Sequence, residues 1–242
     1  MELTYLEFHL LFLLPVLSVL SLSLLAREVE HVRLQLVGLA VVVALALLYT
    51  TPWDNYLVAR RVWWYGPDRV LATIGHVPIE EYLFFLLQPV LTGLFFFQYL
   101  GRVGLTQRRA RARSAWGGFG LFAALTLLGG VLLMRDAPNG IYMGLILSWA
   151  SPVLAGMWLY DGETLWQYRS ALLYTVGLPT LYLWVADATA ITAGIWTISS
   201  EMTLGVSLFT LPLEEATFFL VTNLLVVKGI LLLLYGNHDT LE

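Results

Sequence analysis

The stretch VPIEEYLFFLLQP, residues 77–89, places two adjacent glutamates, Glu80 and Glu81, directly before a long apolar run. The stretch LPLEEATFFLVTN, residues 211–223, repeats this arrangement with a second glutamate pair. Proline is favoured at the start of a helix, and carboxylates in the first turn interact favourably with the helix dipole. Each stretch therefore predicts the beginning of an apolar helix, and the recurrence indicates two similar halves.

The composition is that of a membrane protein. Hydrophobic residues make up 59% of the chain and charged residues 12%, which is about half the charged fraction of a typical soluble domain. Several apolar blocks exceed the roughly 18 to 20 residues that cross a bilayer as a helix. Cysteine is absent, which excludes disulfides, thiolate nucleophiles and cysteine metal sites. We expect an all-α polytopic protein whose surroundings are the lipid bilayer, without a nucleic-acid partner.

Seven segments are long and apolar enough to be transmembrane helices. We expect them near residues 3–25, 33–51, 75–100, 116–134, 139–160, 167–187 and 206–234. The segment 52–74 is too polar to span and is rich in Trp, Tyr and Arg, so we expect it at the membrane interface. Its counterpart, 188–205, is expected to be interfacial or re-entrant.

The basic residues predict the orientation in the membrane. Seven spans place the two termini on opposite sides. One side carries nine cations, namely Arg27, Arg33, Arg102, Arg108, Arg109, Arg111, Arg113, Arg169 and Lys228. The other side carries four, namely Arg60, Arg61, Arg69 and Arg135. By the positive-inside rule the first side is cytoplasmic, so we expect an external N-terminus in the cell membrane, with both glutamate pairs towards the outer face.

Polar residues recur at matching positions in the two halves. Tyr49 precedes Asp54 by five positions, and Tyr182 precedes Asp187 by five. A glutamate pair begins 26 positions after the first aspartate and 27 after the second. These intervals predict an internal repeat of three helices.

The repeat predicts three parts, namely a first unit at 1–100, a basic loop with a linker helix at 101–138, and a second unit at 139–242. Three helices are an odd number, so direct fusion would invert the second unit, and the linker helix restores its orientation. We therefore expect parallel repeats whose acidic residues converge in one site on the same side of the membrane.

The acidic residues are expected to form a working site. Each glutamate pair is followed at once by aromatic residues, Phe84 and Phe85 or Phe218 and Phe219. Ionisable residues within a membrane are costly and usually functional. Burial beside aromatic rings favours a protonated carboxyl group, and aromatic faces stabilise a cation. This pattern suits proton-initiated carbocation chemistry on an apolar substrate, and it suits a proton-coupled transporter equally well.

Other patterns point to packing or to less favoured functions. Gly118 and the pair Gly140 and Gly144 lie within spans and predict close helix packing. The four histidines lack the spacing of a metal site, so we expect no metal. Lys228 would suit a retinal Schiff base, but Leu224 occupies the position one turn earlier where an acid would be required.

Three motifs carry a family resemblance. PWDN at residues 52–55, HVPIEEYLFF at 76–85 and LPLEEATFFL at 211–220 resemble the integral-membrane lycopene cyclases, in their fused single-chain form. The resemblance covers nearly the whole chain. It implies an isomerase that closes the linear ends of lycopene into rings, giving β-carotene in most members. It implies no cofactor, because this family is unrelated to the flavin-binding soluble cyclases.

The resemblance also implies site residues. The acidic motif of the family is matched by Glu80, Glu81, Glu214 and Glu215, and its Asp-Asn pair by Asp54 and Asn55. The second half departs from this pattern, because Asp187 is followed by Ala188. One composite site with unequal halves fits this divergence better than two identical sites. Candidates for cation stabilisation are Trp53, Trp63, Trp64 and Trp196.

The implied reaction is redox-neutral. A protonated carboxyl group delivers a proton to C2 of the terminal double bond, the C5–C6 alkene attacks the C1 cation, and a base removes the C6 proton to leave a β-ring. Removal of a C4 proton would give an ε-ring. The residues leave open which glutamate is the acid, whether one or both ends react, and the oligomeric state. A transporter with parallel three-helix repeats and a non-catalytic carotenoid- or retinal-binding scaffold remain the alternatives.

Overall fold

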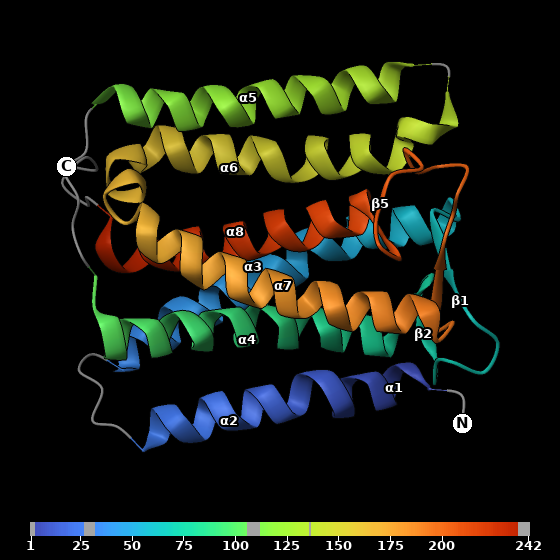
Figure 1. The fold of residues 1–242 in the computed structure, drawn as a ribbon, viewed down its shortest axis with the longest axis horizontal. Coiled ribbons are helices and arrows are strands. Elements are labelled where there is room, and N and C mark those ends of the chain that lie inside the picture. Colours follow the sequence, from blue (N-terminus) through green and yellow to red (C-terminus); the bar gives the residue numbers. More distant parts are fainter. Residues whose placement is uncertain (1–2, 27–31, 106–111, 136, 237–242) are drawn as a thin grey trace.

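The computed structural model describes residues 3–26, 32–105, 112–135 and 137–236, and it is an all-α bundle (Figure 1). Seven helical segments are long and apolar enough to cross a membrane, namely Tyr5–Leu25, Val32–Ala59, Ile79–Val103, Trp116–Met134, Pro138–Gln167, Arg169–Thr192 and Leu213–Tyr235. The expectation of seven spans is confirmed. Of the cations that predicted the orientation, Arg27, Arg108, Arg109 and Arg111 lie outside the described residues, as does the side chain of Arg113.

The first span consists of three segments. Its parts are α1 (Tyr5–Phe8), a π-helical turn (His9–Leu13) and α2 (Leu14–Leu25). The remaining helices are α3 (Val32–Ala59), α4 (Ile79–Val103), α5 (Ala112–Met134), α6 (Ile141–Gln167), α7 (Arg169–Thr192) and α8 (Leu213–Tyr235). A short 3-10 turn, Pro138–Gly140, precedes α6.

Six short strands lie together at one end of the bundle (Figure 1). They are β1 (Trp63–Tyr65), β2 (Thr73–Ile74), β3 (Val77–Pro78), β4 (Trp196–Ile198), β5 (Ser207–Leu208) and β6 (Leu211–Pro212). The described N-terminal end of the chain lies at this strand end, and α8 finishes at the opposite end (Figure 1). The odd number of spans thus separates the two chain ends, as the sequence predicts.

Three helices are longer than the sequence predicts. We expected the span that contains α6 to end at residue 160, but α6 continues to Gln167 past a kink at Asp161, whose backbone is not helical (φ −153°, ψ 67°). We expected spans to end at residues 51 and 187, but α3 continues to Ala59 and α7 to Thr192. Asp54 and Asp187 therefore lie within two of the seven membrane-length helices, and only residues 60–74 of the segment that we expected at the interface lie outside α3. The hydropathy argument was wrong here because both aspartates are 2% exposed and face the bundle interior, where their polarity is no obstacle to a helical conformation.

Two helices begin later than the sequence predicts. We expected starts at residues 75 and 206, but α4 begins at Ile79 and α8 at Leu213. The preceding residues form the antiparallel hairpins β2–β3 and β5–β6. Pro78 and Pro212 are the N-cap residues of these helices, and a proline disfavours a helical conformation in the residue before it. The expected helix start at each glutamate pair is confirmed.

A two-stranded sheet joins the two halves of the chain across the strand end. β1 and β4 pair antiparallel, with Trp63 opposite Ile198 and Trp64 opposite Thr197. Main-chain hydrogen bonds extend the pairing at both ends, from the N–H of Gly66 to the carbonyl of Ile195 (3.0 Å) and from the N–H of Ser199 to the carbonyl of Val62 (2.8 Å). One strand from each half thus meets the other in this sheet.

Two tyrosines tie the halves together deeper in the bundle. The Tyr49 hydroxyl on α3 donates to the Trp149 carbonyl on α6 (2.9 Å). The Tyr182 hydroxyl on α7 donates to the Phe12 carbonyl in the π-helical turn (2.6 Å). Each tyrosine hydroxyl donates to a main-chain carbonyl in the first helix of the other half. The equal spacing from Tyr49 to Asp54 and from Tyr182 to Asp187 therefore corresponds to equivalent contacts of the two tyrosines.

The linker helix α5 lies at the edge of the bundle and packs against α6 (Figure 1). A Cβ atom at Gly129 would lie 2.9 Å from the Leu147 side chain, and one at Gly144 would lie 2.9 Å from that of Leu133. Glycine therefore permits this close approach, and the predicted small-residue packing is confirmed.

Candidate functional site

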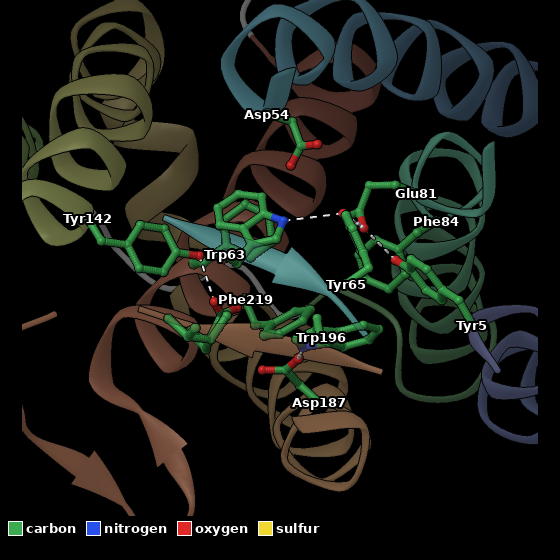
Figure 2. Close-up of a pocket in the computed structure, with 13 residues that line it drawn as sticks. Tyr5, Asp54, Trp63, Tyr65, Glu81, Phe84, Tyr142, Asp187, Trp196 and Phe219 are labelled. Carbon is green, nitrogen blue, oxygen red and sulfur yellow. Dashed lines mark hydrogen bonds between the residues drawn. The ribbon is translucent and has the colours of Figure 1, made fainter. Parts of the chain in front are cut away.

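A small cavity lies beneath the β1–β4 sheet and is lined by residues from both halves (Figure 2). Its volume is about 40 Å³. The polar side chains in its wall are four carboxyl groups and three phenols, and the other lining residues are aromatic or aliphatic. The lining consists of Tyr5, Asp54, Trp63, Tyr65, Glu81, Phe84, Tyr142, Asp187, Trp196, Ile198, Glu215, Phe218 and Phe219.

Glu81 is held by two tyrosines of its own half. The Tyr5 hydroxyl donates to its Oε2 atom (2.7 Å), and the Tyr65 hydroxyl donates to the same atom (2.9 Å). The indole N–H of Trp63 donates in turn to the Tyr65 oxygen (3.2 Å; Figure 2). Burial and, next in size, the nearby Glu81 carboxylate raise the pKa of Tyr65 well above its usual range. Tyr65 therefore remains a protonated hydrogen-bond donor.

Glu215 is held by one tyrosine. The Tyr142 hydroxyl on α6 donates to its Oε1 atom (2.7 Å), as the Tyr5 hydroxyl of the first span does to Glu81. Ile198 occupies the position in β4 that Tyr65 occupies in β1, so the second phenol is missing from this half. The two carboxyl groups are therefore equivalent in position but unequal in hydrogen bonding.

The two aspartates differ in the same way. The indole N–H of Trp196 donates to the Oδ1 atom of Asp187 (2.9 Å; Figure 2), whereas the matching indole of Trp63 is directed to Tyr65. The Oδ2 atoms of Asp54 and Asp187 are buried without a hydrogen-bond partner in the described part of the chain. Unpaired buried carboxyl oxygens are costly, so their presence in the wall of a cavity makes this cavity a candidate site.

The first glutamate of each pair does not line the cavity. The Oε1 atom of Glu80 accepts the main-chain N–H of Leu71 (2.8 Å), and that of Glu214 accepts the N–H of Leu204 (2.7 Å). Each therefore fixes the loop that precedes a hairpin. Within each Glu-Glu pair, the first carboxyl group positions a loop and the second faces the cavity.

Asn55 also has its contacts outside the cavity. Its Oδ1 atom accepts the N–H of His76 (3.0 Å), and its amide donates to the Tyr82 hydroxyl (3.0 Å). Tyr82 donates to the Ile74 carbonyl (2.9 Å), so the two side chains hold the β2–β3 hairpin against α3. Alanine replaces both residues in the second half, which explains why the Asp-Asn motif occurs once.

The expected aromatic residues are distributed over four places. Trp63, Trp196, Phe84, Phe218 and Phe219 line the acidic cavity. Trp53 stacks on Trp149 (4.6 Å between ring centroids) and on Phe218 (5.7 Å), and these two rings also contact each other (6.3 Å). Phe85 lines a second, apolar cavity, and Trp64 is 43% exposed at the strand end.

The tyrosines were missed by the sequence analysis. Tyr5 and Tyr142 lie at equivalent places near the beginning of the first helix in each half, and each N–H donates to the carbonyl of a loop residue, Arg69 or Met202. This equivalence was a detectable signal, but insertions between the halves shift the two tyrosines out of the register of the acidic motifs. Tyr65 has no counterpart in the second half and therefore left no repeat signal.

No metal site is evident in the described segments. Within residues 3–26, 32–105, 112–135 and 137–236, no three His, Cys, Asp or Glu side chains are arranged to hold a metal ion. The arrangement instead combines proton donors and acceptors with aromatic walls in a space that excludes bulk water. Such a site can move protons to and from an apolar molecule and can stabilise a transient cation.

Comparisons with known proteins agree with this chemistry. A family model described as Lycopene cyclase matches residues 3–100 and 139–233. The lycopene beta-cyclase of Halobacterium salinarum strain R1 is 42% identical over 201 residues, which are 83% of each chain. The bifunctional lycopene cyclase/phytoene synthase of Podospora anserina is 35% identical over 236 residues, and that of Blakeslea trispora is 36% identical over 234.

The fungal relatives are much longer than this chain. The matches cover 91% of this chain and 38% of the Podospora protein, and 93% of this chain and 38% of the Blakeslea protein. The chain therefore spans less than half of these bifunctional relatives and most of the Halobacterium relative. No solved structure matches the chain.

We predict that the first glutamate of each pair contributes to stability. Glu80→Ala and Glu214→Ala each leave a main-chain N–H without its acceptor, which should lower the free energy of unfolding by about 1–3 kcal/mol. Glu80→Gln and Glu214→Gln keep an acceptor oxygen and should lose less. Thermal unfolding in detergent, followed by tryptophan fluorescence, measures the change.

The exposed Glu201 provides a matched control. Glu201→Ala should unfold at the wild-type temperature. If Glu80→Ala and Glu214→Ala also did so, the hydrogen bonds to Leu71 and Leu204 would contribute nothing to the fold.

Proposed function

Since the chain belongs to the lycopene cyclase family, we propose that it closes the linear ends of lycopene into β-rings by proton-initiated, redox-neutral cyclisation. The observation that carries this proposal is the cavity in which Glu81, Glu215 and two aspartates meet beneath aromatic walls. An apolar polyene offers no group for binding by polar contacts, so four buried carboxyl groups serve its chemistry. Family membership does not favour the transporter alternative.

We assign the general acid to Glu215 and the base to Glu81. Two phenols donate to one oxygen of Glu81, and hydrogen bonds to a carboxylate favour its ionised form. Glu215 receives a single phenol, so its protonated form is favoured over that of Glu81. The proton from Glu215 would go to C2, the C1–C6 bond would form, and Glu81 would take the proton from C6.

We assign supporting roles to the other acidic and amide residues. Asp54 and Asp187 add two buried carboxyl groups to the same cavity, and mutual repulsion prevents all four groups from being ionised together. In this proposal, Asp54 and Asp187 donate the proton that restores the protonated form of Glu215 after each turnover. Glu80, Glu214 and Asn55 position the β2–β3 and β5–β6 hairpins and the loops before them, and they do not contact the substrate.

Aromatic rings are well placed to stabilise the cation. Trp63 and Trp196 line the cavity on the sheet side, and Phe84, Phe218 and Phe219 line it from α4 and α8. Ring faces attract a cation without forming a bond to it, so the tertiary carbocation survives until the C6 proton is removed. Trp53 supports this wall indirectly by stacking on Phe218, and Phe85 contacts the rest of the substrate.

We propose further that residues 1–100 and 139–242 are parallel repeats joined by the linker 101–138. The matched hydrogen bonds of Tyr49 and Tyr182, and of Glu80 and Glu214, support this assignment. The two matched segments of the family model support it as well. In Figure 1, α3 and α4 run in the same respective directions as α7 and α8.

The reaction predicts isotope incorporation. Membranes that contain the protein and lycopene, incubated in deuterated water, should yield rings with one deuterium at C2, because the acid exchanges with solvent between turnovers. In ordinary water the product should have the same mass as lycopene. Linear, unlabelled lycopene would contradict the cyclase proposal and would be the result for a transporter or a scaffold.

The assigned roles predict two different defects. Glu215→Gln cannot deliver a proton and should leave lycopene unreacted. Glu81→Gln keeps the acid, so residual turnover should yield rings in which the cation is quenched differently, by loss of the C4 proton or by addition of water. Chromatography of the pigments distinguishes these outcomes at equal protein levels, and the opposite pattern would exchange the two roles.

We propose that the strand end faces the outside of the cell and the C-terminus the cytoplasm. The chain has no cysteine, so single cysteines report their own position. Phe209 is fully exposed at the tip of the β5–β6 hairpin, and Val103 is 62% exposed at the far end of α4. An impermeant maleimide should label Phe209→Cys but not Val103→Cys in intact cells, and labelling of Val103→Cys alone would reverse the orientation.

A further inference from the structure

Four neutral polar side chains form a cluster inside the apolar bundle, away from the acidic cavity. They are Gln88 and Thr92 on α4, Thr180 on α7 and Asn223 on α8, and each is at most 6% exposed. A buried polar group without a partner is costly, so such side chains are expected to bond to one another. We call these four residues the polar cluster.

Asn223 is the centre of the polar cluster. Its Oδ1 atom accepts hydrogen bonds from the side-chain amide of Gln88 (2.6 Å) and from the hydroxyl of Thr92 (2.6 Å). Its own amide donates to the Thr180 hydroxyl (3.0 Å). Because α4 belongs to the first half of the chain and α7 and α8 belong to the second, these bonds join the two halves.

The polar cluster has no symmetric copy. Counting from the cavity-facing glutamates, Pro89 of the first half matches Asn223. By the same count, Val226 of the second half matches Thr92. Neither the proline nor the valine side chain can form a hydrogen bond. The cluster is therefore a specific feature of one contact between α4 and α8 and does not follow from the repeat.

The polar cluster lies two helical turns away from the cavity-facing glutamates, on the same two helices. Gln88 follows Glu81 by seven positions on α4, and Asn223 follows Glu215 by eight positions on α8. These intervals correspond to about 10 Å and about 12 Å along the helix axis, and they return to the same helix face. The bonds between Gln88 and Asn223 therefore fix the position of Glu81 relative to Glu215 along the bundle.

Apolar contacts alone would fix this position less sharply. The Phe84 and Phe219 rings of α4 and α8 meet edge to face, with 6.1 Å between their centroids. Apolar contact is not directional, so a small slide of one helix along the other costs little. Hydrogen bonds of 2.6 Å are lost by a slide of about 1 Å. A single buried asparagine sets the register of paired helices elsewhere for the same reason.

We propose that the polar cluster positions the acid and the base, because it sets the register of α4 against α8. This inference rests on the proposed function. Thr92, Thr180 and Asn223 line neither cavity, so they act on the reaction through the two helices. A misplacement of about 1 Å at a reacting group can cost about a hundred-fold in rate. A slipped register would also leave the base too far from the C6 proton.

The first test removes the whole polar cluster from the full chain in membranes. The variant combines Gln88→Leu, Thr92→Val, Thr180→Val and Asn223→Leu, so that no member is left without a partner. Replacement of all partners by apolar groups of similar shape is nearly neutral for stability. The variant should unfold in detergent at about the wild-type temperature, yet its turnover of lycopene should fall at least ten-fold. Its remaining products should include rings formed by loss of the C4 proton or by addition of water.

A second test uses a residue that lines neither cavity. Thr92→Val should lower kcat at least three-fold with an unchanged KM, and Thr92→Ser, which keeps the hydroxyl, should restore it. Thr175→Val is the matched control and should keep wild-type turnover. Thr175 is fully buried on α7, but its hydroxyl donates to the Ala171 carbonyl of its own helix (2.7 Å).

Three results would overturn the proposal. One is wild-type turnover and products in the fourfold variant. Another is a loss of turnover that follows the amount of folded protein, with unchanged products, because the cluster would then act on stability alone. If the fourfold variant does not accumulate, equal turnover of Thr92→Val and Thr175→Val would be the third. A wild-type protein that closed no rings would instead contradict the proposed function itself.

Discussion

The structure depends on the enclosure of four carboxyl groups at one end of an apolar bundle. Three of them are buried, and Glu81 is partly buried. Carboxylates inside a membrane are tolerated only when partners or protonation reduce their charge. Partners are present for three of the four groups. Two tyrosines donate to Glu81, one tyrosine donates to Glu215, and the Trp196 indole donates to Asp187. The contact between the two halves encloses these groups together with Asp54. The same conditions keep water out and protons available, so the constraint on folding is also the condition for the proposed chemistry.

Sequence reasoning identified the helices and the acidic motifs, but it did not distinguish the roles of the two glutamates within each pair. Long apolar blocks predict spans reliably because the bilayer thickness sets their length, whereas the ends of α3 and α7 depended on where Asp54 and Asp187 face. Glu80 and Glu81 are neighbours in sequence, yet they point to a loop and to the cavity, respectively, because adjacent residues on a helix do not share a face. Tyr5 and Tyr142 were missed although they occur in both halves, because they contact glutamates that lie 76 and 73 residues away in the sequence.

The differences between the halves carry most of the functional specificity. Tyr65 against Ile198 makes the hydrogen bonding of the two glutamates unequal, and Trp196 donates to Asp187 whereas Trp63 donates to Tyr65. Asn55 and Tyr82 have both become alanine in the second half, as expected for two residues that act only together. In the proposed mechanism, the two halves supply two copies of each position. The differences between the copies give them different roles, such as acid and base.

The β1–β4 sheet has a further consequence for how such a chain is assembled. The phenols that hold Glu81 belong to the first half, and the phenol that holds Glu215 belongs to the second, so each half brings its own prepared carboxyl group. None of the described residues of α5 lines either cavity. The linker therefore contributes by joining the two halves covalently. Their association is then intramolecular, which raises the effective concentration of each half near the other. Two separate chains with the same sheet residues would form the same site by association, at a cost set by their dilution.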